Sequence, residues 1–351
     1  MRYKLFGRTG LRVSELALGA MVFGDQRGPW GATRPDAARI VEQFAEAGGN
    51  LIDTANNYAG GNSEEIVGEL VAGERRHWVI STKYVSSHDP DDPNAGGAHR
   101  KNLVQSLETS LRRLRTDYVD ILWVHIWDAF TPVDEVVRAL DDVVRAGKVL
   151  YVGVSDTPAW LVSQAATLAE LRGWSRFAGL QVPYSLVQRT VERELLPMAK
   201  ALELTVTAWS PLGDGVLTGR YGTDRPKPQN SRIAGVGATH WITERNLAIA
   251  DAVNRIAEAK GVTSAQVALA WVSAQQTRSV IVPIVGVRTP AQLTDNLGAL
   301  AVDLDPVELN TLDDISRIEL GFPYDFGAGR FVYGNTLHSI DDHRGLIEPL
   351  A

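Results

Sequence analysis

The chain has 351 residues, of which 35 are basic and 42 are acidic, so its formal net charge is −7. This acidic balance argues against sequence-independent binding to nucleic acid, which depends on an excess of basic charge. The absence of cysteine excludes a disulfide framework, a thiolate metal site and a thiol nucleophile, and it fits a reducing cytoplasm. We expect a soluble, cytoplasmic protein without membrane contact. No apolar run reaches the roughly 20 residues of a spanning helix, and the first residues lack a signal-peptide core.

Short β-branched segments alternate with segments of helical period along most of the chain, as in a series of βαβ units. The predicted strands are Leu16–Gly19, Asn50–Thr54, Trp78–Lys83, Tyr118–His125, Val149–Val154, Gly179–Val182, Leu204–Trp209 and Val280–Val285. Eight strand–helix pairs in succession favour an α/β fold of the closed (β/α)₈ type, the TIM barrel. An open doubly wound sheet is the alternative.

Two of the intervening segments carry clear helix signals. Apolar residues from Val133 to Val144 recur at helical spacing, and Gly147 follows as a stop. Further along, Asp305, Pro306 and Glu308 stand in the order of an N-cap, a first-turn proline and a capping-box partner. Helices are therefore predicted after the fourth strand and near the end of the chain.

The length exceeds the roughly 250 residues that a barrel of this kind requires. We assign the surplus to three segments: a hairpin in residues 1–15 that closes the barrel floor, an insertion at 213–240 rich in Gly, Pro and polar residues, and a C-terminal tail at 321–351. The sequence therefore predicts one barrel domain spanning residues 1–351.

Polar residues stand at the ends of three neighbouring predicted strands. Asp53 lies at the end of the second strand and Tyr58 on the loop just beyond it, Lys83 ends the third, and His125 ends the fourth. In a (β/α)₈ barrel these carboxyl ends line a common mouth. An ammonium group beside a tyrosine stabilises its phenolate, a carboxylate keeps the ammonium charged, and a histidine can hydrogen-bond the same substrate oxygen. The four residues predict an electrophilic pocket for a carbonyl oxygen.

Several motifs resemble those of the aldo-keto reductase superfamily, in order from Leu16 to about Asn310. They are Asp53–Tyr58, Gly61–Glu64, Thr82-Lys83, Leu111–Leu114, Asp117–Asp120 with His125, and Gly147–Ser155. The resemblance implies a barrel that binds a nicotinamide dinucleotide without a Rossmann domain and reversibly reduces an aldehyde or ketone to an alcohol. It implies that Tyr58 is the general acid, that Lys83 and Asp53 lower the effective pKa of Tyr58, and that His125 orients the carbonyl.

Later strand ends suit such a cofactor. Ser155 and Gln181 can hydrogen-bond a carboxamide, and Trp209 can stack on a nicotinamide ring. Asp156 stands where many relatives have asparagine, and an ionised carboxylate accepts hydrogen bonds but cannot donate them. Arg288 lies where relatives bind the adenosine 2′-phosphate, which favours NADPH over NADH. The other predicted cofactor contacts are Gly19, Met21, Asp53, Ser210, Pro211, Leu212, Gly213, Arg220, Arg232, Gly286, Gln292 and Asn296.

The predicted substrate is a small carbonyl compound that contacts Trp30, Tyr84 and Trp127, because aromatic walls suit an apolar or flat molecule. No histidine pair has metal-ligand spacing, so no metal is expected. Two other functions stay open. One is a regulatory subunit that keeps the cofactor as a ligand, similar to potassium-channel β subunits. The other is a barrel lyase that uses Lys83 as a Schiff-base nucleophile.

Overall fold

The structure, a computed structural model, describes residues 1–24, 31–224, 233, 239–326, 332 and 334–335. Two residues with predicted roles, Trp30 and Arg232, lie outside this range, and their roles stay predictions. Residues 225–232 and 234–238 of the predicted insertion, and most of the predicted tail, also lie outside the described residues.

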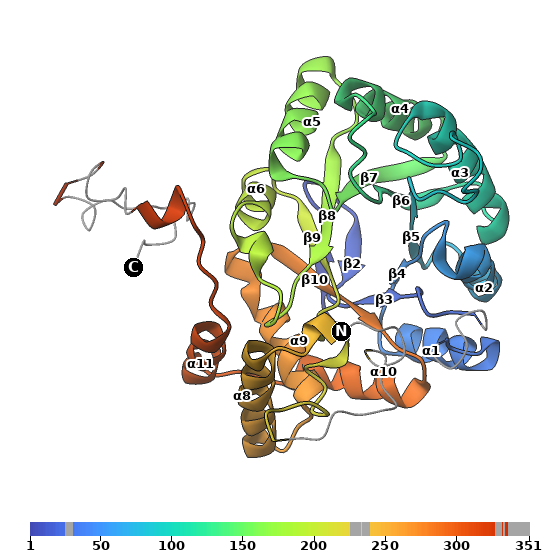
Figure 1. Cartoon of the computed structure of the whole chain (residues 1–351). Helices are drawn as coiled ribbons and strands as arrows, with labels where there is room; N and C mark the ends of the chain where they lie inside the picture. The colour runs from blue at the N-terminus through green and yellow to red at the C-terminus, as the bar shows by residue number, and fades with distance from the viewer. Residues whose placement is uncertain (25–30, 225–232, 234–238, 327–331, 333, 336–351) are drawn as a thin grey trace.

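Parallel strands form a closed barrel in the order β10-β3-β4-β5-β6-β7-β8-β9 (Figure 1). They are β3 (Ala17–Gly19), β4 (Leu51–Asp53), β5 (Val79–Tyr84), β6 (Val119–Val124), β7 (Val149–Ser155), β8 (Phe177–Pro183), β9 (Thr205–Trp209) and β10 (Val280–Gly286). The predicted (β/α)₈ barrel is confirmed, and the doubly wound sheet is wrong. The observed strands correspond one to one with the predicted ones, because the buried β-branched runs mark them directly.

Helices surround the barrel (Figure 1). They are α1 (Arg34–Glu46), α2 (Asn62–Val71), α3 (Arg100–Leu114), α4 (Val133–Arg145), α5 (Ala159–Arg172), α6 (Leu195–Ala201), α8 (Glu244–Lys260), α9 (Ser264–Ala274), α10 (Pro290–Leu297) and α11 (Pro306–Ser316). Both helix signals are confirmed: α4 spans the predicted stripe, and α11 begins with a complete capping box in which Asp305 and Glu308 cap each other's backbone amides. Among the described residues, no helix is long and apolar enough to cross a membrane.

The N-terminal hairpin closes one end of the barrel, as predicted. Strands β1 (Tyr3–Leu5) and β2 (Arg12–Ser14) pair antiparallel. Phe6 is fully buried and packs edge-on against Trp123, with 6.1 Å between the ring centroids. The amide of Gly7 donates to the Thr205 hydroxyl at 2.8 Å, and Thr205 begins β9. The hairpin therefore covers the amino ends of the strands and leaves the carboxyl ends to the opposite face.

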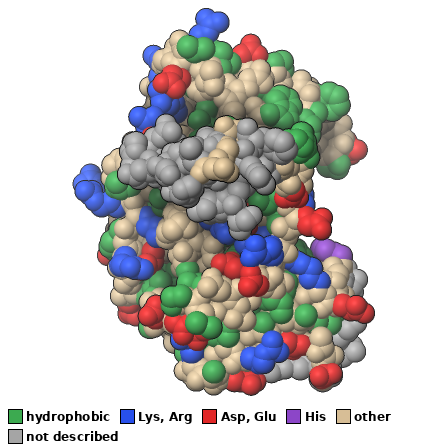
Figure 2. Space-filling model, turned by 90° about the vertical axis from the view of Figure 1, so that its left-hand side faces the viewer, with side chains coloured by type: hydrophobic (Ala, Val, Ile, Leu, Met, Phe, Trp, Pro, Cys, Tyr) green, Lys and Arg blue, Asp and Glu red, His purple; other side chains and the backbone are tan. Residues whose placement is uncertain are grey.

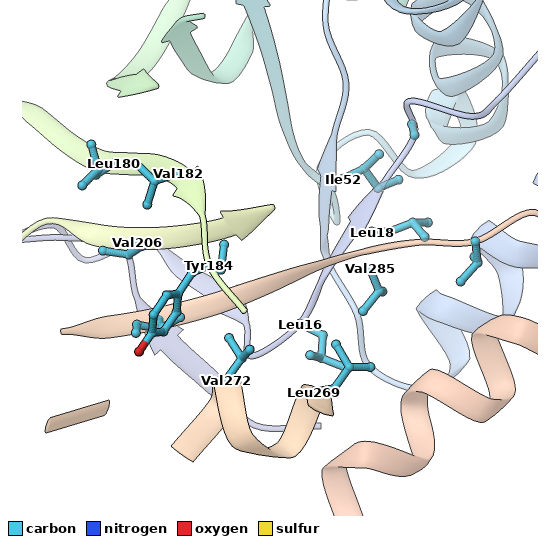
Figure 3. Packing of buried hydrophobic residues seen from close by; sticks show 14 of the residues in the cluster. Leu16, Leu18, Ile52, Leu180, Val182, Tyr184, Val206, Leu269, Val272 and Val285 are labelled. Atoms are coloured by element: carbon cyan, nitrogen blue, oxygen red, sulfur yellow. The ribbon is translucent and has the colours of Figure 1, made fainter. Parts of the chain in front are cut away.

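The core has two parts, one inside the barrel and one between the strands and the helices. Inside, Trp123 fills the space above Gly153 and Gly179, where an added Cβ would overlap its indole ring. Outside, Leu269 and Val272 of α9 pack beside Leu16 and Val285 (Figure 3). The packed interior leaves the strands little freedom, so side chains at their carboxyl ends are held in fixed positions.

Beyond α11, the described part of the C-terminal segment is largely exposed. Phe322 is 84% exposed and Phe326 is 62% exposed, and their rings contact each other edge-on. Arg193 donates to the carbonyl of Glu319 at 3.0 Å and ties the base of this segment to the loop before α6. On the face that Figure 2 presents, acidic and basic side chains are intermixed.

Candidate active site

A cavity of about 620 Å³ opens at the carboxyl ends of the strands. It is lined by the predicted site residues Gly19, Met21, Asp53, Tyr58, His125, Ser155, Asp156, Gln181, Trp209, Ser210, Pro211, Leu212, Arg220, Gly286, Arg288, Gln292 and Asn296. The structure therefore brings together most of the residues assigned from strand ends. Gly213 and Lys83 do not line the cavity: Gly213 is buried at the start of a short 3₁₀ turn, and Lys83 is buried behind Asp53.

Lys83 and Asp53 form a buried ion pair at the base of the cavity. Lys83 also donates to the carbonyl of Thr54 at 2.8 Å. The other Asp53 oxygen accepts from the Ser81 hydroxyl at 2.6 Å and from the Gln181 amide at 3.0 Å. This arrangement fixes the carboxylate and leaves the side-chain oxygen of Gln181 as an acceptor.

The charge state of Lys83 follows from its partners. Burial alone would lower the pKa of Lys83, but the charge of Asp53 and the contact with Tyr58 outweigh it and raise that pKa. Lys83 is therefore a protonated ammonium group at neutral pH. An ammonium group is not a nucleophile, and Lys83 does not reach the cavity surface, so the geometry argues against the Schiff-base lyase.

Tyr58 stands five residues beyond the end of β4, on the short turn Tyr58–Gly61. Its ring lies over the ammonium group of Lys83, with 4.8 Å from Nζ to the ring centroid. Burial raises the pKa of Tyr58, and the charge of Lys83 acts in the opposite direction. The structure corrects one part of the expectation: the charge of Asp53 itself raises the pKa of Tyr58. Asp53 also keeps Lys83 charged and in place.

His125 follows β6 and faces Tyr58 edge-on, with 5.9 Å between ring centroids. Burial, and then the charge of Lys83, lower the pKa of His125 to about 3. The imidazole is therefore neutral at physiological pH and carries one N–H donor. Its Nδ1 lies 3.3 Å from the hydroxyl of Ser86, a cavity residue that the sequence reasoning missed. Ser86 follows β5 by two residues, so the strand-end rule could have identified it.

The cavity continues past Trp209, whose indole nitrogen donates to Asp156 at 3.2 Å. Asp156 and Ser210 both adopt left-handed backbone conformations, with φ of 42° and 48°. Burial raises the pKa of Asp156, and the hydrogen bond from Trp209 acts against that shift. Such conformations persist only where the surroundings enforce them, and they concentrate at binding sites.

Two guanidinium groups face the far part of the cavity, those of Arg220 and Arg288. Burial, and then repulsion by the positive charge of Arg220, lower the pKa of Arg288. An anion between them would relieve that repulsion. Gln292 accepts from the backbone amide of Arg288 at 2.8 Å and so shapes this end of the cavity. The cavity thus has two guanidinium groups at one end. At the other end it has the Tyr58 phenol, with the Lys83 ammonium group behind it. This distribution of positive charge suits an anionic dinucleotide.

The predicted substrate contacts are only partly where we expected them. Tyr84 is almost fully buried and donates its hydroxyl to the carbonyl of Ala98 at 3.2 Å, away from the cavity, so this assignment is corrected. The physical reason is strand alternation: Lys83 points inward, so the next side chain points outward. Trp127 is 47% exposed and does not line the cavity, although its neighbour Ile126 does.

The cavity is also lined by side chains that the positions of the strand ends do not predict. Asn57, Asp214, Thr218, Tyr221 and Asp295 belong to this group. Most of them lie in loops and helix ends whose path depends on tertiary packing. Among the described residues, no cluster of histidine and carboxylate side chains could hold a metal ion.

The fold and the site together define an NAD(P)H-dependent oxidoreductase that acts on small carbonyl compounds. Comparison with known proteins agrees: the model for the Aldo/keto reductase family matches residues 15–317, and the chain belongs to this family. A norsolorinic acid reductase of Emericella nidulans is 39% identical over 331 residues, which cover 90% of this chain and 82% of the relative.

Two further relatives match this chain over a similar share of its length. An aldo-keto reductase of Emericella nidulans is 36% identical over 343 residues, covering 93% of this chain and 84% of its own length. An aryl-alcohol dehydrogenase of Pestalotiopsis microspora is 35% identical over 325 residues, which cover 90% of this chain and 81% of the relative.

Proposed function

We propose that this protein uses NADPH to reduce an aromatic aldehyde or ketone to the alcohol, with Tyr58 as the proton donor. The observation that carries the proposal is the position of Tyr58, which faces the cavity in front of Lys83 and beside His125. A protonated phenol with an ammonium group behind it can give up its proton and leave a stabilised phenolate.

A nicotinamide held by Ser155, Gln181 and Trp209 would supply the hydride for the carbonyl carbon. The carbonyl oxygen takes the proton of the Tyr58 hydroxyl, which leaves an alcohol and a tyrosinate next to Lys83. The neutral imidazole of His125 donates a hydrogen bond to the same oxygen and holds the carbonyl in line. In the reverse direction the tyrosinate accepts the proton of the alcohol.

The choice of NADPH rests on the cavity end that holds Arg220 and Arg288. A 2′-phosphate brings two negative charges and several acceptor oxygens, which match guanidinium donors. The ribose hydroxyl of NADH has no such charge, so we expect it to bind more weakly.

The aromatic substrate class rests on two observations. Beside the cavity residue Ile126, the loop after β6 exposes Trp127 and Phe130, the latter 96% exposed. The amide of Trp127 lies 3.4 Å from the carbonyl of Asp156, which places this loop next to the cavity wall. In addition, relatives are named aryl-alcohol dehydrogenase and norsolorinic acid reductase. A flat ring system would stack on this loop at the mouth.

The test is a substrate panel that pairs aromatic and aliphatic aldehydes of similar size, with NADPH or NADH as the reductant. We expect turnover with NADPH and a higher kcat/KM for the aromatic member of each pair. Phe130→Ala should reduce that preference, whereas Phe322→Ala, on the C-terminal segment, should not. Binding of NADPH without turnover across the panel would contradict the proposal and favour a regulatory subunit.

A further inference from the structure

Two motifs on which the family resemblance rests, Gly61–Glu64 and Leu111–Leu114, take no part in the chemistry above. The structure brings them together. Glu64 at the start of α2 forms an ion pair with Arg113 of α3, with 3.1 Å between Oε2 and Nη1. The Glu64 side chain is completely buried, and that of Arg113 is 25% exposed. Desolvation cancels much of the attraction in such a pair, so its net contribution to stability is limited.

Arg113 holds the loop that carries Tyr58. Its Nη1 donates to the carbonyl of Asn56 at 2.8 Å, two residues before Tyr58. On the other side of Tyr58, Gly61 has φ of 98° and lies flat against the guanidinium group, where an added Cβ would overlap it. One guanidinium group thus contacts the backbone on both sides of the proton donor.

Glu64 holds the strand that carries Lys83. Its Oε1 accepts from the Thr82 hydroxyl at 2.6 Å, and Thr82 directly precedes Lys83 in β5. The amide of Asn56 also donates to the carbonyl of Lys83 at 3.2 Å. The ion pair therefore connects the loop that bears the phenol to the strand that bears the ammonium group.

The loop needs such support. Ala59 and Gly60 both have positive φ, 48° and 64°, and Gly61 follows with a third left-handed conformation. A non-glycine residue in this region is disfavoured and persists only where the surrounding structure fixes it. Without the guanidinium group, the turn could relax and carry Tyr58 away from Lys83.

We propose that Glu64 and Arg113 are positioning residues, which act through Asn56, Gly61 and Thr82 to set the distance between Tyr58 and Lys83. The proposal rests on the assigned role of Tyr58 as proton donor. It gives these two side chains a task in the reaction although neither lines the cavity.

The test compares Arg113→Lys with Arg75→Lys. Lysine keeps a positive charge near Glu64 but is one atom shorter and has no planar face to lie on Gly61. Arg75 is a matched control: it pairs with the buried Asp120 at 2.7 Å and binds the carbonyls of Trp78 and Tyr118, at the amino ends of β5 and β6. Each variant thus removes a guanidinium group that contacts backbone carbonyl oxygen as well as a buried carboxylate. The two groups lie at opposite ends of the barrel.

Two readouts are needed. The first is the NMR resonance of Tyr58 in protein with isotope-labelled tyrosine, assigned by its loss in Tyr58→Phe; it requires no turnover. The second is the steady-state reduction of an aromatic aldehyde. For Arg113→Lys we expect a shifted Tyr58 resonance, a kcat lowered about ten- to a hundredfold, and an unchanged KM for the aldehyde and Kd for NADPH. For Arg75→Lys we expect a lower unfolding midpoint with the resonance and kcat of the unmodified protein.

An unshifted resonance in Arg113→Lys would overturn the proposal, as would a loss of kcat in Arg75→Lys of the same size. If Arg113→Lys does not fold, Glu64→Gln gives the same test, since it removes the charge but keeps the acceptor for Thr82. If the unmodified protein reduces no carbonyl compound, the proposed function fails, and the resonance still decides whether the pair positions Tyr58.

Discussion

The ammonium nitrogen of Lys83 lies 4.8 Å from the centre of the Tyr58 ring, and it forms an ion pair with Asp53. Asp53 and Tyr58 both line the cavity, and Lys83 is buried behind them. Each group sets the state of the next: Asp53 keeps Lys83 charged, and Lys83 counteracts the rise in the pKa of Tyr58 that burial causes. The arrangement suits a phenol that must release its proton to a substrate.

The first prediction concerns the ion pair. Lys83→Met should lower kcat at least about a hundredfold, because the tyrosinate loses its stabilising charge. It should also cost about 3–5 kcal/mol of unfolding free energy, since the Asp53 carboxylate is left buried and unpaired. Asp53→Asn added to Lys83→Met should recover much of that stability but none of the activity. Denaturant unfolding and steady-state kinetics check the two parts; equal stability of the single and double variants would count against the account.

The second prediction concerns pH. The pKa of His125 is about 3 in the folded protein and 6.5 in the absence of structure. Between these values the unfolded chain binds the extra proton, so His125 reduces stability as the pH falls from 6.5 toward 3. Between about pH 7 and pH 4, His125→Asn should lose less unfolding free energy than the unmodified protein, by on the order of 3 kcal/mol. Urea titrations at both pH values measure it, and parallel losses in the two proteins would refute it.

The third prediction concerns the cofactor. Arg288→Leu should weaken NADPH binding about ten- to a hundredfold, the usual contribution of a hydrogen bond to a charged group, and should leave NADH binding nearly unchanged. Tryptophan fluorescence titrations with each nucleotide provide the two Kd values. Arg112→Leu, on the exposed side of α3, is the charge-matched control. Equal weakening of NADPH and NADH would assign Arg288 a different partner from the 2′-phosphate.

The fourth prediction concerns the barrel interior. Gly153→Ala should destabilise the protein by about 1–3 kcal/mol, because the new methyl group would overlap the indole ring of Trp123. At Gly147 the added carbon meets no atom but φ is 73°. Gly147→Ala therefore measures the cost of a strained backbone conformation without any steric overlap. Thermal unfolding compares the variants, and an undiminished stability of Gly153→Ala would mean that the interior is less tightly packed than described.

Strand ends proved to be the most informative part of the sequence. The β-branched runs predict the barrel strands, and the position of active sites in such barrels predicts that Asp53, Tyr58 and His125 meet at one mouth, where the structure has them. The same rule was misapplied to Tyr84, since a side chain next to the inward-pointing Lys83 has to point outward.

Other features depend on packing that no local pattern encodes. Arg220, in the described part of the insertion after β9, and Arg288, in the loop after β10, line the same cavity. The pair of Glu64 and Arg113 forms because α2 packs against α3. Sequence spacing indicates neither contact. Both became visible only when the loops and helices that carry them were placed around the barrel.

The most direct measurement is the oxidation of NADPH by an aromatic aldehyde, followed with the unmodified protein and with Tyr58→Phe, alongside the Kd of NADPH for each. Phenylalanine keeps the ring against Lys83 and removes only the hydroxyl. The account predicts a kcat lowered about a hundred- to ten-thousandfold and an unchanged Kd for NADPH. A Tyr58→Phe protein that turned over at the rate of the unmodified one would contradict the role of Tyr58 as the proton donor.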